Sequence, residues 1–149
     1  MILIDTNGIS FLIEQNLEPL EDCFMSPDVK NEVEMTQLVH GGATPANIME
    51  LNKHLDFDES IYLNHYRKML NKHGGRSFYN MTGFGDISIL SSIHMLLEVY
   101  RNRRIVQLFD FSQDIAVYSN DGGLKGRVGL EFVRESVAVH RIEDLPLKN

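Results

Sequence analysis

Four acidic residues stand where an open α/β sheet would turn their carboxylates toward one crevice. Asp5 and Asp121 each follow a short run of β-forming residues, and ligands in such folds bind outside the carboxyl ends of parallel strands. Glu32 and Asp86 lie at or near the starts of predicted helices. Brought together, the four carboxylates would form a hard, oxygen-rich site of the kind that binds Mg²⁺ or Mn²⁺.

Bringing these carboxylates together is electrostatically unfavourable, and the size of the penalty sharpens the prediction. Two unit charges about 4 Å apart repel by roughly 4 kcal/mol at an effective dielectric constant of about 20. At about 1.4 kcal/mol per pKa unit, this repulsion corresponds to about 3 units. We therefore expect an empty site to hold at least one proton or to recruit cations.

The composition is that of an ordinary soluble protein. The 149 residues are 43% hydrophobic, which suits one core, so a single domain over residues 1–149 is expected. The lone Cys23 excludes an internal disulfide and a cysteine-based zinc site. No signal-peptide pattern precedes the first strand, and no apolar run approaches the roughly 20 residues that span a bilayer. A cytoplasmic protein without a membrane partner is therefore expected.

The net charge of −7 is unusual for a nucleic-acid-binding protein, which normally carries a basic surface. However, a cluster of metal-ligating acids itself lowers the net charge of the metal-free chain. The charge therefore neither supports nor excludes a polyanionic substrate. The six histidines show no metal-binding spacing, and ordinary core or surface roles are expected for them.

Strand and helix signals alternate along the chain, which predicts βαβ units. The expected fold class is α/β, with three αβα layers around a mainly parallel central sheet. Strands are predicted at residues 2–5, 115–118 and 136–142. Helices are predicted directly after the first strand, from Pro27 to before Gly41-Gly42, from Thr44-Pro45 to about His54, from Asp58 to Gly74-Gly75, from Asp86 to about Arg101, and over residues 122–131. Residues 76–85 are expected to form a loop, and residues 103–113 either to lengthen a helix or to add a strand.

The four acids also match, in order, the motifs of a known family. Asp5-Thr6-Asn7 at a strand end resembles the opening motif of PIN-domain nucleases. Residues 27–33, Pro-Asp-Val-Lys-Asn-Glu-Val, are similar to the second motif, in which a helix presents a Glu preceded by a Pro and an apolar residue. Residues 85–90, Gly-Asp-Ile-Ser-Ile-Leu, resemble the third motif, and residues 117–124, Val-Tyr-Ser-Asn-Asp-Gly-Gly-Leu, resemble the fourth. The resemblance spans roughly residues 1–135.

The resemblance implies a metal-dependent endoribonuclease, a hydrolase that cleaves RNA phosphodiester bonds. Asp5, Asp86 and Asp121 would hold one or two Mg²⁺ or Mn²⁺ ions, which lower the pKa of a bound water and stabilise the attacking and leaving oxygens. Glu32 would act at the edge of the site, either as a ligand through water or by orienting the nucleophile. No serine or cysteine nucleophile is needed.

The same resemblance suggests supporting residues and partners. Ser119 is expected to hydrogen-bond a neighbouring acid, and Asn7 to act in a similar way. In size the chain matches the toxin ribonucleases of bacterial toxin–antitoxin modules, which are inhibited by a partner that covers the site and which commonly dimerise. RNA, an antitoxin-like protein and a second copy of the chain are therefore the expected partners, and a processing or phage-type nuclease is the alternative subtype.

Two features depart from the family's pattern. The stretch between Asp86 and Asp121 is longer than in compact members. Glu34 also competes with Glu32 for the second position. Glu32 is preferred because its spacing from Pro27 fits, whereas Glu34 lies about 200° further round a helix.

Basic residues near the predicted site are candidates for substrate contacts. Lys125 and Arg127 follow Asp121 closely and are the preferred phosphate contacts. Arg76 lies in a basic stretch interleaved with aromatic residues, residues 65–79, which has the composition of a single-stranded RNA contact. The ordinary alternative for that stretch is a solvated helix end whose lysines complement the helix dipole.

Each acid has an ordinary structural explanation when it is taken alone. Asp5 and Asp121 suit turns, Asp86 suits a helix N-cap, and Glu32 suits a solvated helix face. The occurrence of all four in order, on the appropriate elements, favours a shared site.

Two other functions compete with the nuclease. The opening segment also resembles the first motif of haloacid-dehalogenase phosphatases, but Asn7 stands where that family has its general acid, and Asp86 lacks the further downstream Asp of that family's last motif. The second alternative is a catalytically silent PIN-like scaffold that binds RNA or a protein. A degenerate site would have little reason to keep all four acids, which argues against the scaffold.

Overall fold

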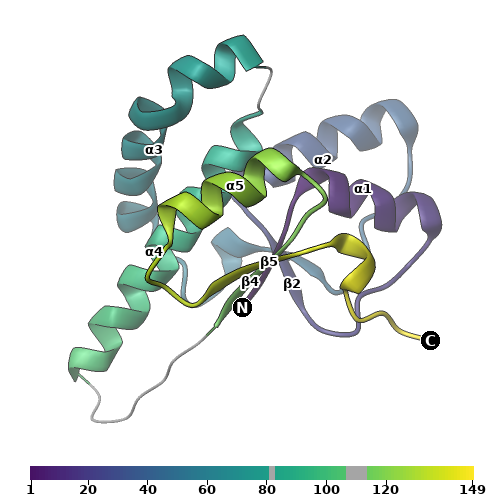
Figure 1. Cartoon of the computed structure of the whole chain (residues 1–149). Coiled ribbons are helices and arrows are strands. Elements are labelled where there is room, and N and C mark those ends of the chain that lie inside the picture. Colours follow the sequence, from purple (N-terminus) through teal and green to yellow (C-terminus); the bar gives the residue numbers. More distant parts are fainter. Residues whose placement is uncertain (81–82, 107–113) are drawn as a thin grey trace.

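The computed structural model describes residues 1–80, 83–106 and 114–149 and confirms the predicted fold class. Within these ranges the chain forms a three-layer α/β fold around an all-parallel sheet of five strands (Figure 1). The strands in sheet order are β3 (Ile48–Glu50), β2 (Cys23–Met25), β1 (Ile2–Ile4), β4 (Ile115–Tyr118) and β5 (Val137–His140).

Helices follow or connect these strands, as the alternating pattern predicts. They are α1 (Thr6–Gln15), α2 (Pro27–His40), α3 (Glu59–Asn80), α4 (Phe84–Val106) and α5 (Gly122–Glu131), with short 3₁₀ turns at Leu51–Lys53 and Ile142–Asp144. Their apolar faces pack on the sheet, and the core includes Leu3 and Ile4 of β1, Val117 of β4 and Leu90 of α4, all of them fully buried. No helix in the described part of the chain is both long and apolar enough to cross a membrane.

The strand order contains one point at which the chain changes direction. After β1 the chain adds β2 and then β3 on one side, and it returns to add β4 and β5 on the other side. In parallel sheets, ligand sites form outside the carboxyl ends of the strands at such a point. Ile4 of β1 pairs with Tyr118 of β4 at this edge, so the next residues of the two strands, Asp5 and Ser119, lie beside each other.

One predicted helix is wrong and one strand was not predicted, because tertiary pairing overrides local signals. The helix predicted from Thr44-Pro45 to His54 is replaced by β3 and a 3₁₀ turn. β3 pairs in parallel with β2, Cys23 with Ile48 and Met25 with Glu50, and β2 itself is not apparent from the sequence pattern. A cap-and-proline signal is a local preference, and strand pairing with a buried neighbour outweighs it.

The predicted end of the next helix at Gly74-Gly75 is also wrong, because α3 continues to Asn80. The predicted loop over residues 76–85 is therefore helical as far as residue 80, and residues 81–82 lie outside the described residues. α4 begins at Phe84, which places Asp86 in its first turn. α4 reaches Val106, so the helix-lengthening alternative holds that far, and residues 107–113 lie outside the described residues.

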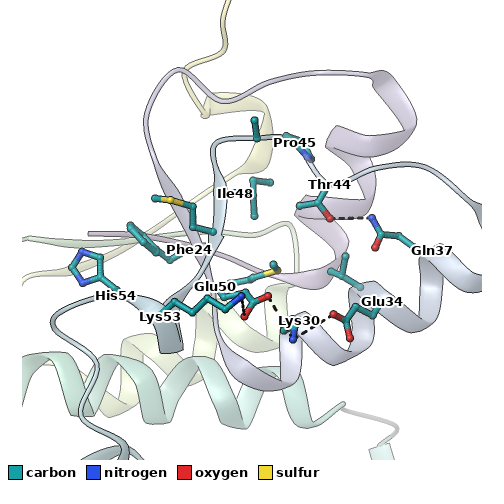
Figure 2. A pocket seen from close by; sticks show the side chains of 14 residues that line it. Phe24, Lys30, Glu34, Gln37, Thr44, Pro45, Ile48, Glu50, Lys53 and His54 are labelled. Carbon is teal, nitrogen blue, oxygen red and sulfur yellow. Dashed lines mark hydrogen bonds and ion pairs between the residues drawn. The ribbon is translucent and has the colours of Figure 1, made fainter.

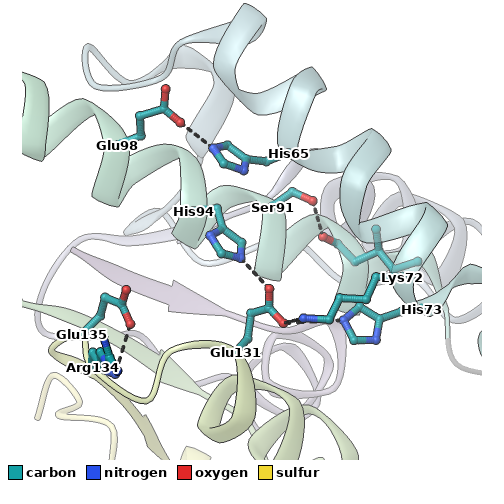
Figure 3. Close-up of polar contacts among 10 residues, drawn as sticks. His65, Lys72, His73, Ser91, His94, Glu98, Glu131, Arg134 and Glu135 are labelled. Atoms are coloured by element: carbon teal, nitrogen blue, oxygen red, sulfur yellow. Dashed lines mark hydrogen bonds and ion pairs between the residues drawn. The ribbon is translucent and has the colours of Figure 1, made fainter.

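The C-terminal end of α5 is attached to α3 and α4 through one carboxylate. The Glu131 side chain is only 9% exposed and accepts hydrogen bonds from Lys72 Nζ at 2.5 Å and from His94 Nε2 at 2.9 Å (Figure 3). Burial alone would raise the pKa of Glu131, but these two hydrogen bonds outweigh it and lower the pKa. The His94 ring stacks on His65, which contacts Glu98 at 2.6 Å. Glu131 thus holds three helices together through charged hydrogen bonds.

We predict that Glu131→Gln lowers the free energy of unfolding at pH 7.5 by about 1 to 3 kcal/mol, because the single amide oxygen cannot replace the two carboxylate oxygens that accept from Lys72 and His94. The pKa of Glu131 is lower in the folded than in the unfolded protein. The carboxylate therefore stabilises the fold at pH values above its unfolded pKa, and this stabilisation is lost as the pH falls through its folded pKa. Urea unfolding at pH 7.5 and at pH 4 measures both effects.

Glu34→Gln is the matched control, since Glu34 is 57% exposed and pairs with Lys30 at the surface. Equal stability of the two variants would contradict the prediction.

Candidate active site

The four predicted acids line one cavity of about 480 Å³. They reach it from four elements: Asp5 follows β1, Glu32 lies on α2, Asp86 lies in the first turn of α4, and Asp121 precedes α5. The remaining lining residues are Thr6, Asn7, Val29, Gly83, Gly85, Ile89, Gly123 and Arg127. The structure therefore brings together residues that are far apart in the sequence, at the edge where β1 and β4 end.

Asp5 is held by hydrogen bonds to both of its oxygens. It is 5% exposed and is the N-cap of α1, where Gly8 N–H donates to Oδ1 at 2.7 Å. The Ser119 hydroxyl, from the neighbouring strand end, donates to Oδ2 at 2.5 Å, which is the kind of contact expected of Ser119. A Cβ atom at Gly8 would lie 2.9 Å from Asp5 Oδ1, so the close approach of this backbone N–H requires glycine. Burial raises the pKa of Asp5 most, the hydrogen bonds from Ser119 and Gly8 oppose this rise, and Asp121 and Glu32 add to it.

Asp121 is the N-cap of α5. Its Oδ1 accepts hydrogen bonds from Gly123 N–H at 2.7 Å and Leu124 N–H at 3.2 Å. Its own N–H donates to Ser119 Oγ at 2.9 Å. Ser119 therefore connects two of the acids, because its hydroxyl donates to Asp5 and accepts from the backbone of Asp121.

Glu32 is enclosed by the loop that leads into α4 and by α1. Its carboxylate accepts hydrogen bonds from Thr6 Oγ1 and from Gly85 N–H, the latter at 3.0 Å. Cβ atoms built at Gly83 or Gly85 would each lie 2.6 Å from a carboxylate oxygen of Glu32. The two glycines therefore leave the space that this carboxylate fills.

The helix that carries Glu32 is itself attached at its first turn. Asp28 accepts a hydrogen bond from Tyr66 of α3, and its backbone N–H donates to Ser88 Oγ of α4 at 3.2 Å. The same Ser88 hydroxyl contacts the Tyr62 hydroxyl at 2.8 Å. These contacts fix α2 relative to α3 and α4, and with it the direction in which Glu32 enters the cavity.

Asp86 is paired with Arg127, which lies on α5. Arg127 Nη1 is 3.2 Å from Asp86 Oδ2, and the two side chains are 21% and 13% exposed. The pKa of Asp86 is nevertheless raised to about 6. Burial is the largest cause, Asp121 is the next, and Asp5 and Glu32 add further repulsion, while Arg127 opposes the rise. One guanidinium therefore does not compensate the negative charge of the four acids.

The donor chemistry of the cavity fits a hard divalent cation such as Mg²⁺ or Mn²⁺. Carboxylate oxygens are the preferred ligands of these ions. A bound cation would neutralise the negative charges of Asp121, Asp5 and Glu32, which together with burial raise the pKa of Asp86. Among the described residues, however, no three histidine, cysteine, aspartate or glutamate side chains are grouped as they stand to hold a metal ion. The acids instead face Arg127, hydroxyl groups and backbone N–H groups, and they must turn from some of these partners to bind a cation.

The other predicted site residues lie in different places. Asn7 is exposed and lines the cavity. Lys125 is exposed on α5 and is not among the lining residues. Arg76 lies in the last turns of α3, and its side chain is outside the described residues. Arg127, predicted to contact phosphate, is directed into the cavity and paired with Asp86.

A second and larger cavity, of about 580 Å³, lies between α2 and the edge strand β3 (Figure 2). Its acids are already compensated, because Lys30 Nζ is 3.4 Å from Glu34 and 3.5 Å from Glu50, and Lys53 Nζ is 3.1 Å from Glu50. Among the described residues that line this cavity, the acids Glu34 and Glu50 are balanced by Lys30 and Lys53. It also places Glu34 away from the four acids, which agrees with the choice of Glu32 as the second acid.

Sequence reasoning missed the groups that position the acids. Thr6, Gly83 and Gly85 all lie against Glu32, and although Thr6 and Gly85 stand beside the predicted acids Asp5 and Asp86 in the sequence, no local pattern predicts their contact with Glu32. The pairing of Arg127 with Asp86 joins two helices and has no local signal. The Gly-Phe-Gly segment before Asp86 was the available sign of a close backbone approach.

Comparisons of the chain with models of known protein families, with curated proteins and with solved structures found no match. The resemblance to PIN-domain nucleases therefore stays a prediction, and function is inferred from the site itself.

We predict that Asp86→Asn raises the free energy of unfolding of the metal-free protein by about 1 to 2 kcal/mol at pH 7.5. Each unit by which the pKa is raised corresponds to about 1.4 kcal/mol of unfolding free energy. Solvent screening and relaxation of the structure reduce the gain that we expect. The sign follows from the raised pKa: as pH rises from about 4 to 6, the unfolded chain loses this proton first, so stability falls.

Urea unfolding in EDTA at pH 7.5 and pH 4 measures this effect. The gain of the Asp86→Asn variant shrinks toward pH 4, where the wild-type carboxyl group is protonated in the folded state. Asp22→Asn, at an exposed position, serves as the control with little effect at either pH. A less stable Asp86→Asn protein at pH 7.5 would show that the pairing with Arg127 outweighs the repulsion among the acids.

Proposed function

We propose that the protein is a metal-dependent endoribonuclease that hydrolyses RNA phosphodiester bonds. One observation carries this proposal: four carboxylates from four separate elements line a single cavity, where burial raises the pKa of Asp86 most and the other three acids raise it further. Such a cluster destabilises the empty fold, so it needs a compensating role. Binding of a divalent cation supplies that compensation.

The residues of the chain have distinct roles in this proposal. Asp5, Asp86 and Asp121 would hold the cation, since they surround the cavity at the ends of β1 and β4 and at the starts of α4 and α5. Ser119 orients Asp5 by donating a hydrogen bond to one of its carboxylate oxygens. Glu32, held by Thr6 at the edge of the cavity, would orient the attacking water.

When bound, Mg²⁺ or Mn²⁺ would lower the pKa of a water molecule and stabilise the developing charge on the attacking and leaving oxygens. The cavity is open to solvent at Asn7 and Gly123, both of which are exposed, so a polymer can approach it. Arg127 supplies the positive charge at the cavity wall that a phosphate requires, and Lys125 adds an exposed charge on the same helix.

The choice of RNA as substrate rests on the resemblance to PIN-domain nucleases. The same resemblance supports a toxin of a toxin–antitoxin module, an inhibitory protein partner that covers the cavity, and a homodimer. A processing or phage-type nuclease has the same site requirements. Toxicity of the chain when it is expressed without a partner distinguishes the toxin from these other nucleases.

A catalytically silent scaffold that binds RNA or a protein is the second candidate, and one observation favours it. Each of the four acids already has a protein partner, and in the described part of the chain no three acids are spaced to hold a metal. A scaffold would keep these internal contacts permanently. The nuclease must exchange some of them when a cation enters.

We predict that the wild-type protein cleaves a mixed single-stranded RNA pool in Mg²⁺ or Mn²⁺ and not in EDTA. The double variant Asp5→Asn with Asp86→Asn should lose at least about 10²-fold in rate, because the cation loses two of its ligands. Gel analysis of end-labelled RNA measures the rate. Circular dichroism shows whether the variant is folded.

Glu34→Gln is the matched control for this experiment, since Glu34 lies on the same helix as Glu32 but lines the other cavity. It should cleave at the wild-type rate. Absence of cleavage by folded wild-type protein in every metal would support the scaffold. Cleavage that persists in EDTA would contradict the metal-dependent mechanism.

A further inference from the structure

We infer that Arg127 is a resident counter-cation of the acid cavity: it competes with a divalent cation for Asp86 and is released toward the substrate phosphate when the cation binds. This inference rests on the proposed function, because it assumes that a divalent cation enters the cavity. It assigns Arg127 two successive contacts, first with a carboxylate and then with the substrate.

The first argument is the position of Arg127. It reaches from α5 into the cavity, and its Nη1 lies 3.2 Å from Asp86 Oδ2. Asp86 is 13% exposed, and after burial the charge of Asp121 is the largest cause of its raised pKa, which Arg127 opposes. The guanidinium thus stands beside Asp86 and partly offsets the repulsion that a bound cation would also offset.

The second argument is the charge balance. Of the described residues that line the cavity, Arg127 is the only lysine or arginine, and it stands against four acids. A guanidinium carries one positive charge on a broad planar group, whereas a divalent cation carries two on a small ion. The two repel each other across so short a distance, and both cannot remain beside Asp86 at low energy.

The third argument concerns what can move. The start of α5 is fixed by the N-cap Asp121, and its end is fixed by Glu131, which contacts Lys72 and His94 (Figure 3). The backbone at Arg127 is therefore held between two anchors, so release from Asp86 would take place by rotation of the long arginine side chain and not by movement of α5. A guanidinium freed at the cavity wall has the planar fork that binds a phosphate with two hydrogen bonds.

Competition of this kind is reciprocal. If the cation weakens the contact between Arg127 and Asp86, then that contact weakens binding of the cation by the same factor. Removal of the arginine charge should therefore strengthen cation binding, although it weakens the interaction with substrate. A merely structural arginine predicts the opposite, because its loss would disturb the acids and weaken cation binding.

The test is Mn²⁺ binding at pH 7.5, measured by isothermal titration calorimetry and by the electron paramagnetic resonance of free Mn²⁺. We expect Arg127→Gln to bind Mn²⁺ about tenfold more tightly than the wild type, which corresponds to about 1.4 kcal/mol. Arg127→Lys keeps a positive charge and should bind close to the wild-type value. If Arg127→Gln does not fold, Arg127→Lys still tests the proposal, because a merely structural role of Arg127 would make this variant bind Mn²⁺ more weakly than the wild type.

Arg103→Gln is the matched control, because Arg103 pairs with Asp56 at 2.7 Å at the far end of α4, outside the cavity. Its Mn²⁺ affinity should equal that of the wild type. Unchanged or weaker Mn²⁺ binding by folded Arg127→Gln overturns the inference and leaves the proposed function standing. Absence of Mn²⁺ binding by all the proteins overturns the proposed function as well.

Discussion

Repulsion among carboxylates in a partly buried cavity is the constraint on which the site depends. Asp5 and Asp86 lie among other acids, and burial together with this repulsion raises the pKa of both. A fold can keep such a cluster only if other groups hold the side chains in place. Here the holding groups are backbone N–H groups at the starts of α1, α4 and α5, the hydroxyls of Thr6 and Ser119, and the guanidinium of Arg127.

The arrangement of the sheet concentrates these groups in one place. The chain reverses its direction of strand addition between β1 and β4, and the helices that follow these strands begin at the same edge. Asp5 and Asp121 each cap one of these helices, so the same oxygens that complete a helix also face the cavity. The same residues thus stabilise the helices and form the site. At the other end of α5, Glu131 fixes the helix against α3 and α4 through its hydrogen bonds from Lys72 and His94.

Much of the fold follows from local patterns. The strand at β1, the helix that begins at Pro27 after the N-cap Ser26, and the helix of residues 122–131 were all predictable, because turn residues and apolar spacing mark their limits. β2 and β3 were not predicted, because no local signal marks them and they are defined by parallel pairing, β2 with both β1 and β3. Gly74-Gly75 failed as a stop signal, since α3 continues to Asn80 in spite of the helix penalty of glycine.

The residues that carry the candidate chemistry could be identified from the amino-acid sequence. Carboxylates that follow strands or open helices are recognisable from their neighbours, and all four predicted acids line the same cavity. The partners of those acids, in contrast, depend on the tertiary structure. The pairing of Arg127 with Asp86 and the enclosure of Glu32 by Thr6 and Gly85 join elements that are distant in the chain. Such contacts depend on how helices pack, and no local spacing encodes them, because a side chain's partner is set by the positions of whole elements.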